Sequence, residues 1–150
     1  LIPGCGSAWE AAHLAELGWP VTALDFSPQA IEAARAVLGK APVDLVCADF
    51  FTFAPARPIA LIYERAFLCA LPRKLWADWG RRVAELLPPG GLLAGFFFLC
   101  EQPKGPPFGI QPAELDALLA ANFEPIDDAA VSDSIPVFAG RERWQVWRRR

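Results

Sequence analysis

Short apolar runs alternate with amphipathic segments along most of the chain. The apolar runs have the length of buried strands and are bounded by glycine, proline or acidic residues; they cover residues 21–24, 43–48, 58–63 and 92–99. The other segments carry apolar residues at the three- and four-residue spacing of helices and cover residues 9–17, 28–38, 75–87 and 112–121. This alternation predicts a mainly parallel sheet flanked by helices.

The two ends of the chain depart from this alternation. Only Leu1 and Ile2 precede the first glycine turn, so we expect a truncated first strand and a missing N-terminal segment. Near the other end, residues 123–131 and 143–148 have the pattern of two strands in an edge hairpin. The predicted fold is α/β and Rossmann-like, with a seven-stranded, mostly parallel sheet, helices on both faces and a C-terminal antiparallel hairpin. It forms one domain over residues 1–150.

Composition narrows the classes of function. The chain is 54% hydrophobic, which fits a globular protein, and its net charge of -3 without a cationic stripe argues against nucleic acid as a partner. The longest apolar stretch, residues 91–100, is about half the length that a membrane-spanning helix needs. The four cysteines share no Cys-x-x-Cys spacing, which argues against a metal site or disulfides. We expect a cytoplasmic monomer that binds no metal, membrane or nucleic acid.

A glycine turn and an acidic residue carry the clearest chemical signal. Pro3, Gly4, Cys5 and Gly6 lie between the first strand and the first helix, and Asp25 closes the next strand 21 residues after Gly4. In such a βαβ unit the glycines let a ligand approach the backbone, and the acid binds the ribose hydroxyls. The pattern therefore predicts a nucleoside-binding site.

The residues after the turn favour one nucleoside over another. A dinucleotide prefers a third glycine, but the chain continues with Ser7, Ala8, Trp9 and Glu10. The acid at Glu10 would repel a pyrophosphate, whereas it could suit the amino group of a methionine moiety. The C-terminal hairpin also departs from a dinucleotide-binding fold. S-adenosylmethionine (SAM) therefore fits better than NAD, and an NAD-type oxidoreductase stays open as an alternative.

Several segments resemble one enzyme family. Residues 3–6 and 21–31 are similar to the first two motifs of class I SAM-dependent methyltransferases. Residues 63–72, which read Tyr-Glu-Arg-Ala-Phe-Leu-Cys-Ala-Leu-Pro, resemble the fourth-strand signature of the thiopurine S-methyltransferase-like family. Residues 87–91, 105–108 and 142–144 agree in order and spacing, so the resemblance covers nearly the whole chain. The sequence departs from the family at Ala8, where glycine is usual.

The resemblance implies a set of site residues. Expected to bind the donor are Gly4, Cys5 and Gly6 at its methionine part, Asp25, Phe26 and Ser27 near its ribose, and Asp49 and Phe50 at its adenine. Glu64 and Arg65 are expected where donor and acceptor meet, both as catalytic residues and Glu64 also as a donor contact. The implied reaction is methyl transfer from SAM to a small-molecule thiol, thiopurine or similar soft nucleophile, leaving S-adenosylhomocysteine.

Some alternatives stay open from the sequence alone. Arg65 could favour a reactive thiolate by its charge, or it could form a salt bridge with Glu64 or another acid. A homologue that binds SAM without turnover is also possible, because in the family the N-terminal segment closes over the donor. Aliphatic thiols, aromatic thiols, halides and metalloid oxyanions all fit as acceptors.

Overall fold

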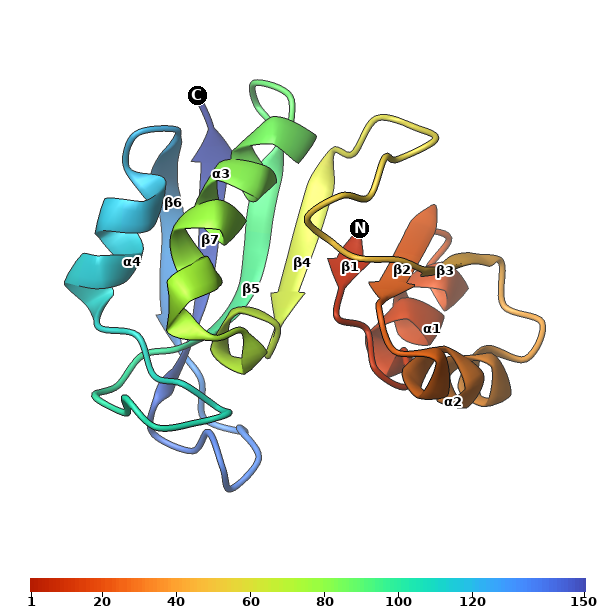
Figure 1. Cartoon of the computed structure of the whole chain (residues 1–150), viewed down its shortest axis with the longest axis horizontal. Coiled ribbons are helices and arrows are strands. Elements are labelled where there is room, and N and C mark those ends of the chain that lie inside the picture. Colours follow the sequence, from red (N-terminus) through yellow and green to blue (C-terminus); the bar gives the residue numbers. More distant parts are fainter. The chain divides into compact units, whose positions relative to one another are not determined.

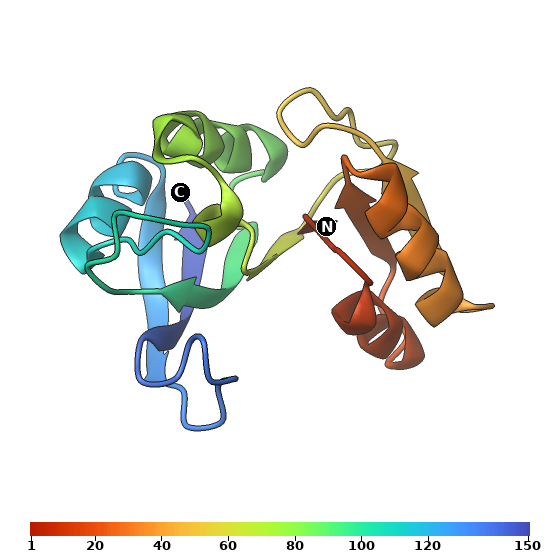
Figure 2. The ribbon, with the colours of Figure 1, turned by 60° about the horizontal axis from the view of Figure 1, so that its bottom comes forward.

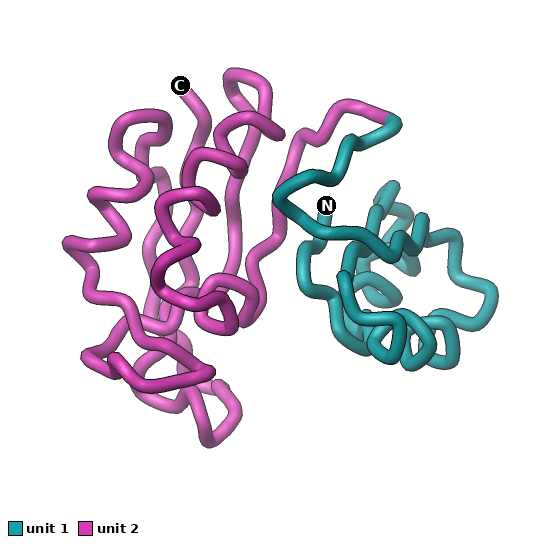
Figure 3. Tube along the Cα trace, in the orientation of Figure 1, with its two compact units in different colours: residues 1–56 teal, residues 57–150 magenta.

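The computed structural model describes all 150 residues, which fall into two compact units, residues 1–56 and 57–150 (Figure 3). Each unit contains its own sheet and its own pair of longer helices (Figure 1). None of the helices combines the length and the apolar character needed to cross a bilayer.

The first unit is a small parallel α/β arrangement. Its elements are β1 (Ile2–Pro3), α1 (Trp9–Glu16), β2 (Val21–Asp25), α2 (Pro28–Leu38) and β3 (Val43–Cys47). The strands form a parallel sheet in the order β1-β2-β3, and α1 and α2 contact each other and the sheet. The Ser27 hydroxyl caps α2 by accepting a hydrogen bond from the Ala30 N–H, and Pro28 is the first helical residue.

The second unit is a mixed sheet covered by two helices. Its elements are β4 (Leu61–Arg65), the 3-10 helices η1 (Leu68–Ala70) and η2 (Arg73–Leu75), α3 (Trp76–Leu86), β5 (Leu92–Phe98), α4 (Pro112–Leu119), β6 (Phe123–Ala130) and β7 (Glu142–Arg149). The strand order is β4-β5-β7-β6, with β4 and β5 parallel and β7 antiparallel to both of its neighbours. Helices α3 and α4 pack side by side, since a Cβ at Gly80 would lie 3.0 Å from the Leu118 carbonyl oxygen (Figure 2).

The prediction of a single seven-stranded sheet is wrong. The seven strands form one sheet of three and one of four, and no strand pairing joins them. Strand β1 has only two residues, and Pro3 lacks an N–H, so β1 offers too few hydrogen bonds to join the two sheets. The expected helices are present, but as one pair for each sheet. The α/β class and the short first strand are confirmed.

The predicted C-terminal hairpin is present, but only one of its two strands lies at the edge of the sheet. Strands β6 and β7 are antiparallel as predicted, but β7 lies between β5 and β6, so only β6 is at the edge. Trp147 is 2% exposed while Trp144 is half-buried, and their odd spacing places them on opposite faces of β7. Trp76 and Trp79 are buried in α3, as the helical spacing predicts.

Strand β4 is placed differently from the prediction at both ends. It begins at Leu61 instead of residue 58, and it includes Glu64 and Arg65, which pair with Gly95 and Phe96 of β5. Successive side chains of a strand point to opposite faces of the sheet. The side chains of Glu64 and Arg65 therefore point to opposite faces of the sheet, although the two residues are neighbours in the sequence.

Gly95 allows β5 to approach β4 at this point. A Cβ on Gly95 would overlap the carbonyl oxygen of Glu64 and would lie 2.7 Å from the Glu64 Cβ. Because the obstacle is backbone in the middle of a sheet, it cannot move aside cheaply.

We predict that Gly95→Ala lowers the free energy of unfolding by about 2 kcal/mol or more, since overpacking a core costs about 1–3 kcal/mol. Gly90→Ala is the matched control in the same unit, because a Cβ there meets nothing and only the left-handed backbone (φ 84°) is penalised. Urea unfolding of both variants is the measurement. Equal losses in the two would show that the close approach at Gly95 carries no special constraint.

Candidate functional site

The glycine turn between β1 and α1 is built from left-handed residues. Gly4, Gly6 and Ala8 have φ angles of 61°, 52° and 61°. Glycine adopts this conformation freely, whereas an alanine is strained by about 1–2 kcal/mol. Ala8 is 1% exposed and its N–H donates to the Cys5 carbonyl at 2.8 Å, so packing and a hydrogen bond hold it there. The left-handed backbone at Ala8 therefore suits the glycine that the resemblance implies at this position.

The Asp25 carboxylate ties this turn to the end of β2. Its Oδ2 accepts a hydrogen bond from the Gly6 N–H at 3.0 Å, and its Oδ1 accepts one from the Ser27 N–H at 2.9 Å. Each oxygen keeps a further lone pair, which is what a ribose hydroxyl requires of an acceptor. The arrangement fits the predicted nucleoside, and it gives Asp25 a structural role that its spacing from Gly4 did not reveal.

The two phenylalanines expected near an adenine differ in exposure. Phe26, directly after Asp25, is 78% exposed, whereas Phe50 is 4% exposed and packs edge-on against Phe51 with 5.4 Å between ring centroids. A flat, exposed aromatic ring beside a ribose acceptor is suited to stacking on a base. Phe26 therefore offers such a surface, and Phe50 offers only its backbone.

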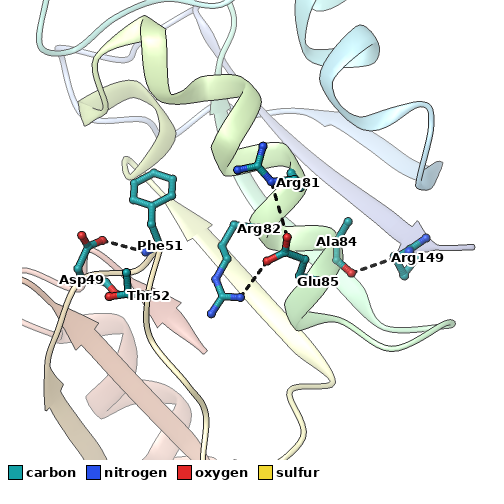
Figure 4. Close-up of polar contacts among 8 residues, drawn as sticks. All are labelled: Asp49, Phe51, Thr52, Arg81, Arg82, Ala84, Glu85 and Arg149. Carbon is teal, nitrogen blue, oxygen red and sulfur yellow. Dashed lines mark hydrogen bonds and ion pairs between the residues drawn. The ribbon is translucent and has the colours of Figure 1, made fainter.

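The segment after β3 lies next to the Asp25 end of β2. The Ala48 N–H donates to the Asp25 carbonyl at 3.0 Å. Asp49 then turns the chain, because its Oδ1 accepts the Phe51 N–H at 2.8 Å (Figure 4). The structure thus brings the predicted donor residues of the first unit to one edge of its sheet.

Cys5 lies inside the turn and is not a nucleophile at neutral pH. Burial and the nearby Asp25 raise the pKa of its thiol to about 11. All four cysteines of the chain are free. No group of three histidine, cysteine, aspartate or glutamate side chains lies close enough to hold a metal ion.

Glu64 is a buried carboxyl group at the end of β4. It is 1% exposed, and its Oε1 accepts the N–H groups of Phe67 and Leu68 at 2.8 and 3.1 Å. Its Oε2 is buried and has no hydrogen-bond partner in the protein. Burial raises the pKa of Glu64 to about 7, against the opposing effect of the two N–H donors.

Arg65, on the other face of β4, contacts an acid and two aromatic rings. It forms an ion pair with Oε1 of Glu142, the first residue of β7. Its guanidinium carbon lies 4.7 Å from the ring centroid of Phe96 and 5.8 Å from that of Phe138. The Arg65 side chain keeps 23% of its surface exposed. The residue that follows, Ala66, is the second strained alanine, with φ 57°.

The sequence analysis missed the acid that pairs with Arg65. Glu142 belongs to the 142–144 motif that contributes to the family resemblance, but it lies 77 residues from Arg65, and no local pattern links the two. The aromatic residues around the guanidinium, Phe96 and Phe138, were missed as well. The structure brings together Arg65 and Glu142, and it separates the side chains of Glu64 and Arg65.

Comparisons with known proteins support the family resemblance that the sequence shows. The model of the family "Thiopurine S-methyltransferase (TPMT)" matches residues 1–150, the whole chain. Among curated proteins, "Probable thiol methyltransferase 2" of Arabidopsis thaliana is 29% identical over 99% of this chain and 69% of its own length. A thiopurine S-methyltransferase of Vibrio cholerae is 42% identical over 49% of this chain and 34% of its own length.

A solved structure shows the same fold. The SAM-dependent methyltransferase of Methanosarcina mazei matches with a TM-score of 0.83 at 17% identity, over 99% of this chain and 90% of that chain. The comparisons give no support to the NAD-type alternative. The chain belongs to the thiopurine S-methyltransferase family, and it is a small-molecule methyltransferase whose methyl donor is SAM.

Proposed function

We propose that this enzyme methylates a small-molecule thiol, thiopurine or similar soft nucleophile. The observation that carries the proposal is the glycine turn fixed by Asp25, followed in the chain by the exposed ring of Phe26, an arrangement that suits a nucleoside. Sulfur as the accepting atom is supported by the relatives, whose names are those of thiol and thiopurine methyltransferases.

The donor site is assigned to the first unit. The residues that would hold SAM are Gly4, Cys5, Gly6, Asp25, Phe26, Ser27, Asp49 and Phe50. When bound, SAM supplies a methyl carbon on a positively charged sulfur. The role of Asp25 is to accept the ribose hydroxyls, and the role of Phe26 is to cover the adenine. For Phe50, which is buried, only the backbone is assigned a contact.

Arg65 is assigned to the acceptor. The acceptor sulfur gives a lone pair to the methyl carbon, the bond from that carbon to the donor sulfur breaks, and its electron pair stays with S-adenosylhomocysteine. Such a displacement needs mainly positioning and exclusion of water. The guanidinium of Arg65 is suited to positioning, because Phe96 and Glu142 fix its orientation while part of it stays exposed.

Glu64 is assigned a positioning role. A carboxyl group that is 1% exposed is poorly placed to touch either substrate. By accepting the N–H groups of Phe67 and Leu68, it fixes the turn that follows Arg65, including the strained backbone of Ala66. The catalytic and donor-binding roles implied for Glu64 by the resemblance are therefore replaced, in this proposal, by support of Arg65.

The setting proposed for the enzyme is the cytoplasm, where it would act as a monomer. All four cysteines are free, which a reducing compartment would maintain.

We predict that Asp25→Asn weakens S-adenosylhomocysteine binding by about tenfold or more, because the amide loses a charge-assisted acceptor. It should also destabilise the first unit, since an amide cannot accept both backbone N–H groups on its two terminal atoms. Calorimetric titration well below the unfolding temperature measures the affinity. Asp44→Asn on the exposed side of β3 is the control. Wild-type affinity in a folded Asp25→Asn protein would refute the ribose assignment.

We predict that Arg65→Lys lowers kcat/KM for the thiol by about tenfold, or roughly 1.4 kcal/mol, because lysine keeps the charge but loses the planar fork and the stacking. Affinity for S-adenosylhomocysteine should stay within a few-fold. Steady-state kinetics and binding measurements on both proteins test this prediction. The control is Arg148→Lys, because Arg148 forms an exposed ion pair with Glu124. Loss of donor affinity with an unchanged acceptor KM would place Arg65 in the donor site.

We predict that Glu64→Gln flattens the pH dependence of stability. The pKa of Glu64 is about 7 in the folded protein and about 4.5 in the unfolded chain, so the folded state binds the proton more tightly. Stability from this group is present at pH 5 and is lost as the pH rises towards 8, by on the order of 2 kcal/mol. Urea unfolding across this range compares wild type, Glu64→Gln and the exposed control Glu85→Gln (Figure 4). An identical slope in all three proteins would show that Glu64 titrates normally.

A further inference from the structure

Arg141, the residue before β7, joins two loops at the carboxyl end of β5. Its backbone carbonyl accepts the Leu99 N–H at 2.7 Å. Its guanidinium donates to Oε1 of Gln102, in the loop after β5, at 3.0 Å and to the Val137 carbonyl, in the loop before β7, at 2.7 Å. The guanidinium carbon lies 4.9 Å from the ring centroid of Phe98. An exposed guanidinium is thus held in one place by three groups.

The groups that hold the Arg141 guanidinium are all neutral. They are a side-chain amide, a backbone carbonyl and an aromatic ring, and none of them is a carboxylate. Two other arginines of the same unit differ in this respect, because Arg65 pairs with Glu142 and Arg143 pairs with Asp128. Arg141 therefore keeps a charge that no contacting acid cancels.

The other ionisable residues of the two loops do not pair with Arg141. They are Glu101, Lys104 and Asp133, which are exposed and of both signs. Exposed charges that are not in contact are weakened strongly by water and salt. The charge of Arg141 is therefore the one that the fold fixes at this place.

Arg141 and Arg65 contact the same pair of aromatic rings. Phe98 and Phe138 pack edge-on with 5.2 Å between their ring centroids. Arg141 lies over Phe98, and the guanidinium carbon of Arg65 lies 5.8 Å from the ring centroid of Phe138. The two guanidinium groups are therefore separated by no more than this ring pair. The field of an exposed charge extends over roughly 30 Å at about 0.01 M ionic strength, so at low salt Arg141 acts on an ion near Arg65.

The thiol of Cys100 responds to this charge. Cys100 packs against the cluster that contains Phe98 and Phe138. Burial raises the pKa of its thiol, and Arg141 opposes this effect both by its charge and by a hydrogen bond. Arg141 thus favours the anionic form of a sulfur atom beside it.

We infer that Arg141 is a specificity-determining residue, which attracts thiolates and other small sulfur anions towards Arg65. The inference rests on the proposed function, in which Arg65 meets the acceptor. Arg65 offers directed N–H groups while Glu142 cancels its charge, and Arg141 supplies a charge that is not cancelled. A thiol attacks as its thiolate, so its reactive form is an anion that this charge favours.

The test is kcat/KM for thiocyanate, a sulfur anion whose charge is constant near neutral pH. Its sulfur gives a lone pair to the methyl carbon, the bond from this carbon to the donor sulfur breaks, and the electron pair stays with S-adenosylhomocysteine. Arg141→Met keeps an apolar contact with Phe98 but removes the charge. We expect it to lower kcat/KM about fivefold at about 0.01 M ionic strength and less than about twofold at about 0.5 M. Sodium sulfate sets the ionic strength, because a halide could itself accept the methyl group.

Two further variants separate charge from geometry. Arg141→Lys keeps the charge but loses the planar fork, so it should retain about half or more of the wild-type kcat/KM. Arg143→Met is the matched control, because Asp128 pairs with Arg143, and it should stay within about twofold of wild type. S-adenosylhomocysteine binding and thermal unfolding show whether each variant is folded.

Equal losses in Arg141→Lys and Arg141→Met, or wild-type kcat/KM in Arg141→Met at low ionic strength, would overturn the inference. If Arg141→Met does not fold, the wild type decides, because kcat/KM for thiocyanate that does not change with ionic strength would also overturn it. Wild type that methylates 2-mercaptoethanol but not thiocyanate would overturn this inference alone. Wild type that binds S-adenosylhomocysteine but methylates neither acceptor would overturn the proposed function as well.

Discussion

The Asp25 carboxylate holds the glycine turn and the start of α2 at the same time, because its two oxygens accept one backbone N–H from each. The turn itself is strained at Ala8, so it depends on such contacts to keep its shape. The same carboxylate is the group proposed to bind the ribose. On this proposal one side chain links donor binding to the stability of the first unit, so variants at Asp25 should affect both.

Strand β4 places the side chains of Glu64 and Arg65 on opposite faces of its sheet. Because β4 continues through Glu64 and Arg65, one carboxyl group turns into the core to support the following turn, while the guanidinium turns to the opposite face and pairs with Glu142. Glu142 aligns the guanidinium and also cancels its charge.

Much of the fold could be predicted from the sequence, because hydrophobic period, helix caps and glycine turns are local signals. The core positions of α3 and the cap at Ser27 follow from such signals. The division into two sheets does not, since periodicity says nothing about which strands pair. The Arg65–Glu142 ion pair could not be predicted either, because no local pattern links residues on strands far apart in the sequence. The sequence also does not distinguish the exposed ring of Phe26 from the buried ring of Phe50.

We propose that this chain transfers the methyl group of SAM to a thiol, instead of only binding the donor. Incubating the protein with methyl-labelled SAM and 2-mercaptoethanol, and measuring both products by mass spectrometry, tests the claim directly. We expect labelled S-methyl product and S-adenosylhomocysteine in equal amounts, in molar excess over the protein. Tight binding of S-adenosylhomocysteine with no labelled product, from this thiol or from a thiopurine, would contradict it and identify the chain as a non-catalytic member of the family.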